Sequence, residues 1–173
     1  MLVSGVLAGI LAGVAFGGDW RRLATFTLRW WPLLVIATGL RIWTIFYPQS
    51  ELVVHVAGLT GIVVVAAVNW RLAGAALVAF GTFLNVLVIL LNSGMPYDPL
   101  VADGVGAAHP TGRLYVLITS ETRLPFLADI IPFGLGRAIY SVGDFFIAFG
   151  GFLLPFVWVQ PEVDPSKHEL RST

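Results

Sequence analysis

The sequence predicts an all-α integral membrane protein with about five transmembrane helices and a long, partly helical outer segment between the fourth and the fifth. Of its 173 residues, 57% are hydrophobic and only 12% are charged, whereas a soluble domain carries roughly 25% charged residues. A spanning helix needs about 20 mostly apolar residues. Windows of this kind lie at residues 2–18, 31–47, 52–69, 72–92 and 142–160.

These windows define one transmembrane domain over residues 1–160, in which residues 93–140 are the outer segment. The polar residues 161–173 are expected to form a flexible cytoplasmic tail. The first window is not typical of a signal peptide, because no Lys or Arg precedes its apolar core and small residues run through it. We therefore expect it to be a helix of the mature protein.

Basic residues in the short loops predict the orientation in the cell membrane. Because cytoplasmic loops carry an excess of Lys and Arg, the N-terminus is expected outside and the C-terminus in the cytoplasm of a multi-pass protein. The outer segment carries three arginines of its own, which reduces the asymmetry. The residues on the predicted cytoplasmic side are Arg21, Arg22, Arg29, Arg71, Lys167 and Arg171.

The composition argues against several classes of function. Ten basic residues balance ten acidic ones, so no basic patch indicates a nucleic-acid partner. Cysteine is absent, which removes disulfides, thiolate catalysis and cysteine-ligated metals. His55 and His109 show no metal-ligand spacing, so a heme or metal held by this pair is disfavoured and we expect no metal site. No cofactor is assigned.

Helix packing is predicted by glycines in the first window. Gly5, Gly9, Gly13 and Gly17 recur every four residues and therefore share one helix face. Small residues let helices approach closely in lipid. This face is expected to pack against another helix of the same chain, or to form the seam of a homo-oligomer or of a complex with partner subunits.

The outer segment is too rich in Leu, Ile and aromatic residues to remain disordered in water. Leu124, Leu127 and Ile131 recur at helical spacing, which predicts a short helix over residues 122–131 at the membrane interface. Pro125 would lie in its first turn, where a missing backbone donor is tolerated. Gly, Pro and Asp before this stretch are typical of turns.

Polar residues within the apolar windows are expected to lie in the outer half of the bundle, because ionisable groups in a bilayer are costly and mark functional sites. For Asp144 the alternatives are a helix-capping box with Ser141 or an ion pair with Arg41. Arg41 alone would extend to lipid phosphates. The candidate set for a ligand site or a polar lock is Arg41, Asn85, Asn92, Arg123, Asp129, Ser141 and Asp144, with His55 and His109 as further candidates.

Three motifs carry a resemblance to a known family. The stretches "NSGMPYDP", "ITSETRLPFLADIIP" and "SVGDFFIAFGGF" resemble an uncharacterised bacterial family of small multi-spanning membrane proteins, a domain of unknown function. The likeness covers about residues 80–155 and implies no activity. The signature positions that it implies are Asn92, Gly94, Met95, Pro96, Thr122, Arg123, Asp129, Ser141, Gly143 and Asp144.

The function that these features favour is non-catalytic: a binding or accessory subunit of a membrane complex, with a polar site near the outer leaflet. Its ligand would be a lipid, quinone, pigment or partner helix. One alternative is an enzyme acting on a lipid-linked substrate, with Asp129 or Asp144 as general base and Arg123 binding phosphate or carboxylate. A small transporter is disfavoured by the apolar cytoplasmic half.

Overall fold

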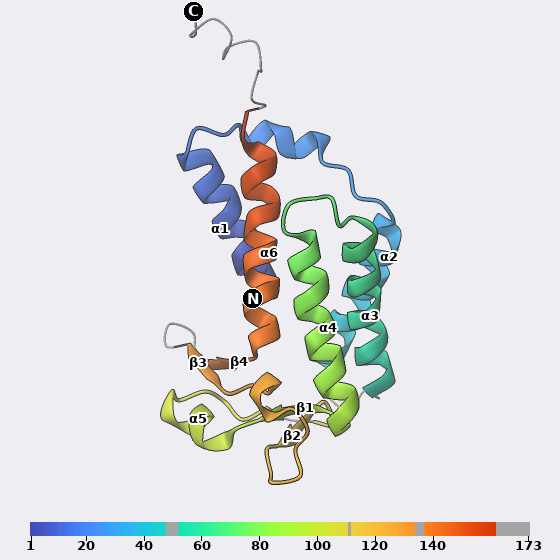
Figure 1. Ribbon diagram of the computed structural model, residues 1–173, viewed down its shortest axis with the longest axis vertical. Helices are drawn as coiled ribbons and strands as arrows, with labels where there is room; N and C mark the ends of the chain where they lie inside the picture. The colour runs from blue at the N-terminus through green and yellow to red at the C-terminus, as the bar shows by residue number, and fades with distance from the viewer. Residues whose placement is uncertain (48–51, 111, 134–136, 162–173) are drawn as a thin grey trace, which may run out of the picture.

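The computed structural model describes residues 1–47, 52–110, 112–133 and 137–161, and most of these residues are helical (Figure 1). Short turns and strands gather at one end, which we call the cap end; the opposite end, where the chain passes residue 160, is the far end. The long helices are α1 (Leu2–Ala15), α2 (Trp31–Phe46), α3 (Leu52–Val68), α4 (Ala75–Asn92) and α6 (Val142–Val159).

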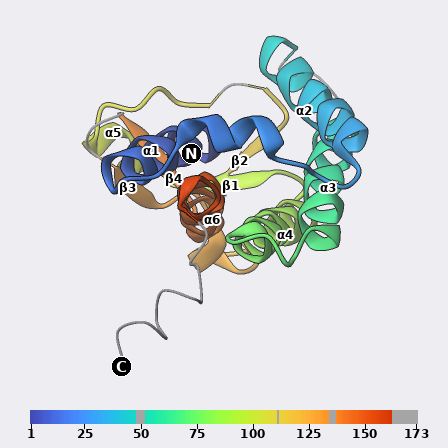
Figure 2. The ribbon, with the colours of Figure 1, turned by 90° about the horizontal axis from the view of Figure 1, so that it is seen from above.

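The helices form an open arc in the order α1, α6, α4, α3, α2, because α6 packs between α1 and α4 while α3 packs between α4 and α2. Seen along the helices, α1 and α2 are the two ends of this arc (Figure 2). The 3-10 helix η1 (Trp20–Thr25) connects them across the far end (Figure 1). The first helix of the chain therefore lies beside the last, and the concave side is bordered by all five.

Length and composition allow two of the described helices, α4 and α6, to cross a membrane, whereas α1, α2 and α3 are apolar but shorter. The predicted windows coincide with the long helices, but the first ends earlier, at Ala15, and the fourth begins later, at Ala75. Apart from Pro161, the predicted tail lies outside the described residues. The two apolar helices indicate membrane association.

The outer segment contains strands, which corrects the prediction of an all-α protein. Strand β1 (Met95–Tyr97) pairs in parallel with β2 (Tyr115–Leu117), and β3 (Ile131–Phe133) pairs antiparallel with β4 (Ala138–Tyr140). One short helix, α5 (Pro99–Gly104), follows β1. We call residues 93–140 the cap.

The helix predicted over residues 122–131 is wrong except for one 3-10 turn, η2 (Pro125–Leu127). Leu124 has a left-handed conformation with φ 51°, and Ala128 is extended, so neither end of the turn continues as a helix. The chain beyond it pairs with backbone instead: the Asp129 N–H donates to Pro96 O at 2.9 Å. Backbone pairing in the cap thus overrides the helical spacing of the apolar residues.

The glycines of α1 pack against α6. A Cβ atom on Gly5 would lie 2.2 Å from the carbonyl oxygen of Ala148, and one on Gly9 would lie 2.1 Å from that of Phe152. Only glycine permits this backbone contact. Gly13 continues the face, but Gly17 lies beyond the end of α1 at φ +90°. The chain's own α6 covers the face, so Gly5, Gly9 and Gly13 do not form an intermolecular seam.

The cap packs on the bundle through an apolar core at the cap end. Leu59 of α3, Val88 and Ile89 of α4, and Met95 and Leu127 of the cap form one buried cluster. This contact fixes the cap against the same helix ends that carry the polar side chains of the bundle.

Candidate functional site

The start of α6 is joined to α4 by a buried hydrogen-bond network. Ser141 and Asp144 form a capping box, in which the Asp144 N–H donates to Ser141 Oγ at 3.2 Å and the Ser141 N–H donates to Asp144 Oδ2 at 3.1 Å. Asn85 Nδ2 donates to Asp144 Oδ1 at 3.2 Å. The capping box predicted from the sequence is confirmed, and Asp144 additionally connects the two helices.

Close helix contact makes this network geometrically feasible. A Cβ atom on Gly143 would lie 2.0 Å from Asn85 Oδ1 and 2.6 Å from the backbone oxygen of Gly81. Glycine at position 143 therefore allows α4 to approach the first turn of α6. Any larger residue would separate Asn85 from Ser141, which donates to Asn85 Oδ1 at 3.0 Å.

Arg41 contacts His55, not Asp144, which corrects the predicted ion pair. Arg41 Nη1 lies 2.6 Å from Nδ1 and 2.8 Å from Nε2 of the imidazole. A guanidinium has only donors, so the ring accepts through its unprotonated nitrogen. His55 is buried, with 7% of its surface exposed, and follows Arg41 closely in the next helix. Arg41 still interacts electrostatically with Asp144 and with Tyr115 of the cap.

The cap contributes a buried carboxyl group to the same region. Asp129 is 8% exposed, and its backbone is held on both sides, since its N–H donates to Pro96 O and its carbonyl accepts from the Asp98 N–H. Its buried Oδ1 atom has no hydrogen-bond partner within the described part of the chain. A buried polar atom without a partner is rare and costly, so in a folded protein it calls for a specific explanation.

Burial and neighbouring charge change the protonation of the cap residues. Burial, and secondarily the negative charge of Asp144, raises the pKa of Asp129 to about 8. Partial burial also raises the pKa of Tyr115, which is still 37% exposed, and the charge of Asp129 raises this pKa further while that of Arg41 lowers it. Asp129 is therefore mostly protonated at neutral pH and can donate a hydrogen bond.

The side chains at this level form a set that we call the polar layer. Hydrogen bonds between α4 and the start of α6, the contact between Arg41 of α2 and His55 of α3, and electrostatic interactions with the cap join its members. Its members are Arg41, His55, Asn85, Tyr115, Asp129, Ser141 and Asp144.

Three predicted site residues lie outside the polar layer. Asn92 holds the cap, because its amide donates to Arg123 O at 2.9 Å and accepts from the Arg123 N–H at 2.8 Å. Arg123 thus contributes its backbone to this contact. His109 hydrogen-bonds to Asp103 at 2.7 Å in the cap, whereas His55 contacts Arg41. The described residues contain no group of three or more His, Cys, Asp or Glu suited to a metal ion.

An apolar cavity of about 170 Å³ lies on the concave side of the arc. Residues from all five long helices line it, together with the chain between η1 and α2. Its lining is apolar except for Asn69 at the far end. The lining residues are Leu2, Val6, Phe26, Leu28, Leu34, Ile62, Val65, Ala66, Asn69, Ala75, Val78, Gly151 and Leu154.

Four helices carry both the polar layer and the cavity wall on one face. On each of these helices, one member of the polar layer lies seven positions, or two helical turns, from a cavity residue. At 1.5 Å per residue the separation is about 10 Å, and in every pair the polar residue lies nearer the cap. The pairs are Arg41 with Leu34, His55 with Ile62, Asn85 with Val78, and Asp144 with Gly151.

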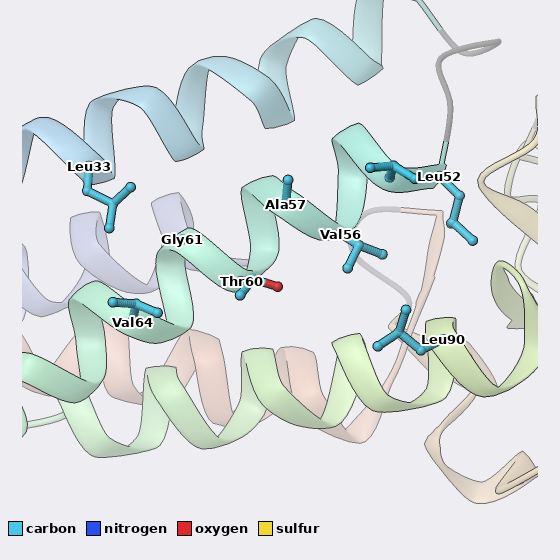
Figure 3. Close-up of a pocket in the computed structure, with 9 residues that line it drawn as sticks. Leu33, Leu52, Val56, Ala57, Thr60, Gly61, Val64 and Leu90 are labelled. Carbon is cyan, nitrogen blue, oxygen red and sulfur yellow. The ribbon is translucent and has the colours of Figure 1, made fainter.

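A larger groove of about 550 Å³ runs along the opposite face of α3, between α2 and α4 (Figure 3). Thr60 is the one polar side chain in its lining. The groove therefore offers a surface to apolar chains but no polar groups that could bind a head group. Its lining residues are Leu33, Leu52, Val53, Val56, Ala57, Thr60, Gly61, Val64 and Leu90.

Sequence reasoning missed Tyr115 and Asn69. Tyr115 lies in a short apolar stretch, where nothing in the spacing indicates that a strand would bring it to the helices. Asn69 had a usable signal, because an amide at the end of an apolar window, like Asn92, can hydrogen-bond to a connecting segment.

Residues 20–156 match a family that is described as a family of unknown function, DUF5317. The match covers well over half of the 173 residues. The chain belongs to the DUF5317 family. The matched region of this DUF5317 chain contains every member of the polar layer and most of the cavity wall. Neither the curated proteins nor the solved structures gave a match.

Proposed function

We propose that this DUF5317 chain is a non-catalytic, multi-pass membrane protein that binds one amphipathic molecule on the concave side of its helical arc. The head group lies in the polar layer near the outer leaflet, and the apolar chain lies in the cavity. Five helices cross the bilayer, with the N-terminus outside and the C-terminus in the cytoplasm. The bound molecule belongs to the lipids or to the quinone- and pigment-like compounds with an apolar tail.

The observation that carries this proposal is the stacking of the polar layer on the cavity. The same faces of α2, α3, α4 and α6 present polar side chains near the cap and apolar side chains two turns further along. Amphipathic ligands have this division, and a few polar groups in an otherwise apolar pocket are typical of small-molecule sites.

The polar layer supports an uncharged, oxygen-bearing head group. Asp144 accepts hydrogen bonds from Asn85 and Ser141, and Arg41 contacts His55. Asp129 retains a buried oxygen without a partner in the described residues. With a pKa of about 8, its carboxyl group is protonated at neutral pH and donates to a carbonyl or hydroxyl oxygen. A quinone or a glycerol-based lipid supplies such an acceptor.

The test is to identify what remains bound after purification. Mass spectrometry and absorbance of extracts from the detergent-purified chain should find one compound in near-stoichiometric amount. In Val78→Trp, an indole fills the cavity, so the compound should no longer copurify. Phe83→Trp is the control, because Phe83 lies on the same helix but is 50% exposed, and this variant should retain the compound. Equal occupancy in both folded variants, or only bulk lipid in the wild type, contradicts the proposal.

The proposed topology is tested by single cysteines, because the chain contains none. In intact cells, a membrane-impermeant maleimide should label Ser120→Cys in the cap and leave Arg21→Cys unlabelled until the membrane is opened. The reverse pattern contradicts the orientation. Labelling of both positions in intact cells contradicts a cytoplasmic far end.

A second candidate, an enzyme acting on a lipid-linked substrate, is favoured by Asp129 alone. A buried carboxyl with a pKa near 8 suits a general base, since the most efficient pKa lies close to the operating pH. If this candidate holds, Asp129→Asn abolishes turnover of the bound compound in a folded protein. The apolar lining of the cavity gives the small transporter no support.

A further inference from the structure

The far end carries a basic pocket that is separate from the polar layer. It has a volume of about 530 Å³ and lies between the chain that precedes α2 and the loop that joins α3 to α4. Two arginines line it, Arg29 and Arg71, and no acidic residue does. The complete lining is Thr27, Arg29, Val68, Asn69, Trp70, Arg71 and Leu72.

Asn69 fixes the backbone of Arg29 at this pocket. The Arg29 N–H donates to Asn69 Oδ1 at 2.9 Å, and Asn69 Nδ2 donates to Arg29 O at 2.9 Å. The same Nδ2 group also donates to Val65 O at 2.7 Å. Asn69 is 6% exposed, whereas Arg29 is exposed. The buried amide therefore holds the main chain, and the Arg29 guanidinium makes no hydrogen bond or ion pair with any residue in the described ranges.

The same arrangement occurs at the cap end, where Asn92 holds the backbone of Arg123 and donates to Val88 O. The pocket beside it has a volume of about 370 Å³ and includes Glu121 with Arg123. One acidic and one basic residue offset each other there. The lining of the far-end pocket contains two arginines and no acidic residue, so of these two pockets the far-end one is complementary to an anion.

Aromatic residues place the far-end pocket at a membrane boundary. Trp70, which lines it, is 64% exposed, and Trp30 and Trp31, which follow Arg29 in the chain, are 55% and 62% exposed. Tryptophan is enriched where membrane meets water. Arg71 lies 5.5 Å from the ring centre of Trp70. The Arg71 guanidinium lies over this exposed indole and makes no hydrogen bond or ion pair with the residues that the structure describes. This arrangement suits the head group of a lipid whose acyl chains lie in the bilayer.

We propose that the pocket formed by Thr27, Arg29 and residues 68–72 binds the phosphate of an anionic phospholipid in the leaflet at the far end. Arginine matches phosphate geometry through two parallel N–H donors, and basic pockets between helix ends bind anionic head groups. The two arginines flank one pocket whose other polar groups, Thr27 and Asn69, are uncharged. The pocket shares Asn69 with the lining of the concave cavity, but neither arginine lines that cavity, so this proposal does not rest on the ligand proposed for the concave side.

The test is native mass spectrometry of the full chain with defined lipids. Phosphatidylglycerol should bind more tightly than phosphatidylcholine by roughly 20- to 30-fold, since each arginine near a membrane surface contributes about fivefold, which corresponds to about 1 kcal/mol. Arg29→Gln and Arg71→Gln should each lose about fivefold. Arg21→Gln, which removes an exposed arginine at the same end of the fold, should retain the preference.

Other outcomes overturn the proposal. If the wild-type chain binds the two lipids equally tightly, the proposal is wrong. It is also wrong if Arg21→Gln loses as much of the preference for phosphatidylglycerol as Arg29→Gln and Arg71→Gln do. If millimolar inorganic phosphate displaces bound phosphatidylglycerol as effectively as added phosphatidylglycerol does, the pocket is a site for the free anion and not for a lipid. Because the concave-side ligand is extracted and identified separately, failure here leaves that proposal unaffected, and the reverse also holds.

Discussion

Replacing Asp129 by asparagine removes a buried carboxyl group whose Oδ1 atom has no hydrogen-bond partner in the described residues. The pKa of this group is about 8, against an ordinary value of 3.8. The folded chain therefore binds more protons than the unfolded chain between about pH 4 and pH 8. Under these conditions the free energy of unfolding falls as pH rises, and it levels off above pH 8.

The magnitude follows from the size of the shift. One pKa unit corresponds to about 1.4 kcal/mol, so the shift from 3.8 to about 8 means that ionising Asp129 costs the folded chain up to about 6 kcal/mol. Asparagine keeps the size of the side chain and carries no charge. Asp129→Asn should therefore match the wild type near pH 4 and exceed its stability by several kcal/mol at pH 9, where the wild-type carboxylate is charged in a buried position and also repels Asp144.

The assay is thermal unfolding in detergent at a series of pH values. The wild-type Tm should fall between pH 5 and pH 8, and the Asp129→Asn Tm should stay level over this range. Glu121→Gln is the matched control, because Glu121 is an exposed acid of the same cap, and its profile should follow the wild type. Parallel profiles for Asp129→Asn and wild type would refute the assignment of a buried, destabilising charge.

Two further predictions concern packing. Gly9→Ala places a Cβ atom against the backbone oxygen of Phe152 and should lower the free energy of unfolding by roughly 1–3 kcal/mol. The control is Gly39→Ala, which should be neutral or stabilising because nothing lies within 4 Å of the added Cβ atom. Equal Tm values for the two variants would show that α1 does not pack closely on α6. Asn92→Leu removes two hydrogen bonds to the backbone of Arg123. Hydrogen exchange at the Arg123 amide should become at least about tenfold faster, while exchange at the amides of the helical bundle should not change. Unchanged exchange at Arg123 would mean that Asn92 does not hold the cap.

Local features of the sequence predicted part of the fold. The stretch "SVGD" predicts the capping box, and α6 runs from its cap at Ser141 to Gln160, because the box and the apolar run are both encoded within a few residues. The glycines of α1 likewise predict close packing. In both cases a short-range pattern determines the structure.

Contacts between distant segments could not be predicted in this way. Arg41 and Asp144 lie at matching depth, but His55 is nearer to Arg41 because α2 and α3 are consecutive helices. The helical spacing around Leu127 was misleading, because Asp129 pairs with the backbone of Pro96. Nothing local indicates that these segments, about 30 residues apart, would meet.

The most direct test of the central claim is a crystal structure of the chain grown in a lipid phase. If the polar layer and the cavity form one site, an elongated molecule should occupy the concave side, with its head group within hydrogen-bonding distance of Asp129 and its tail beside Val78 and Leu154. A concave side filled by the chain's own side chains, with lipid only on the outer faces of the helices, would contradict the claim.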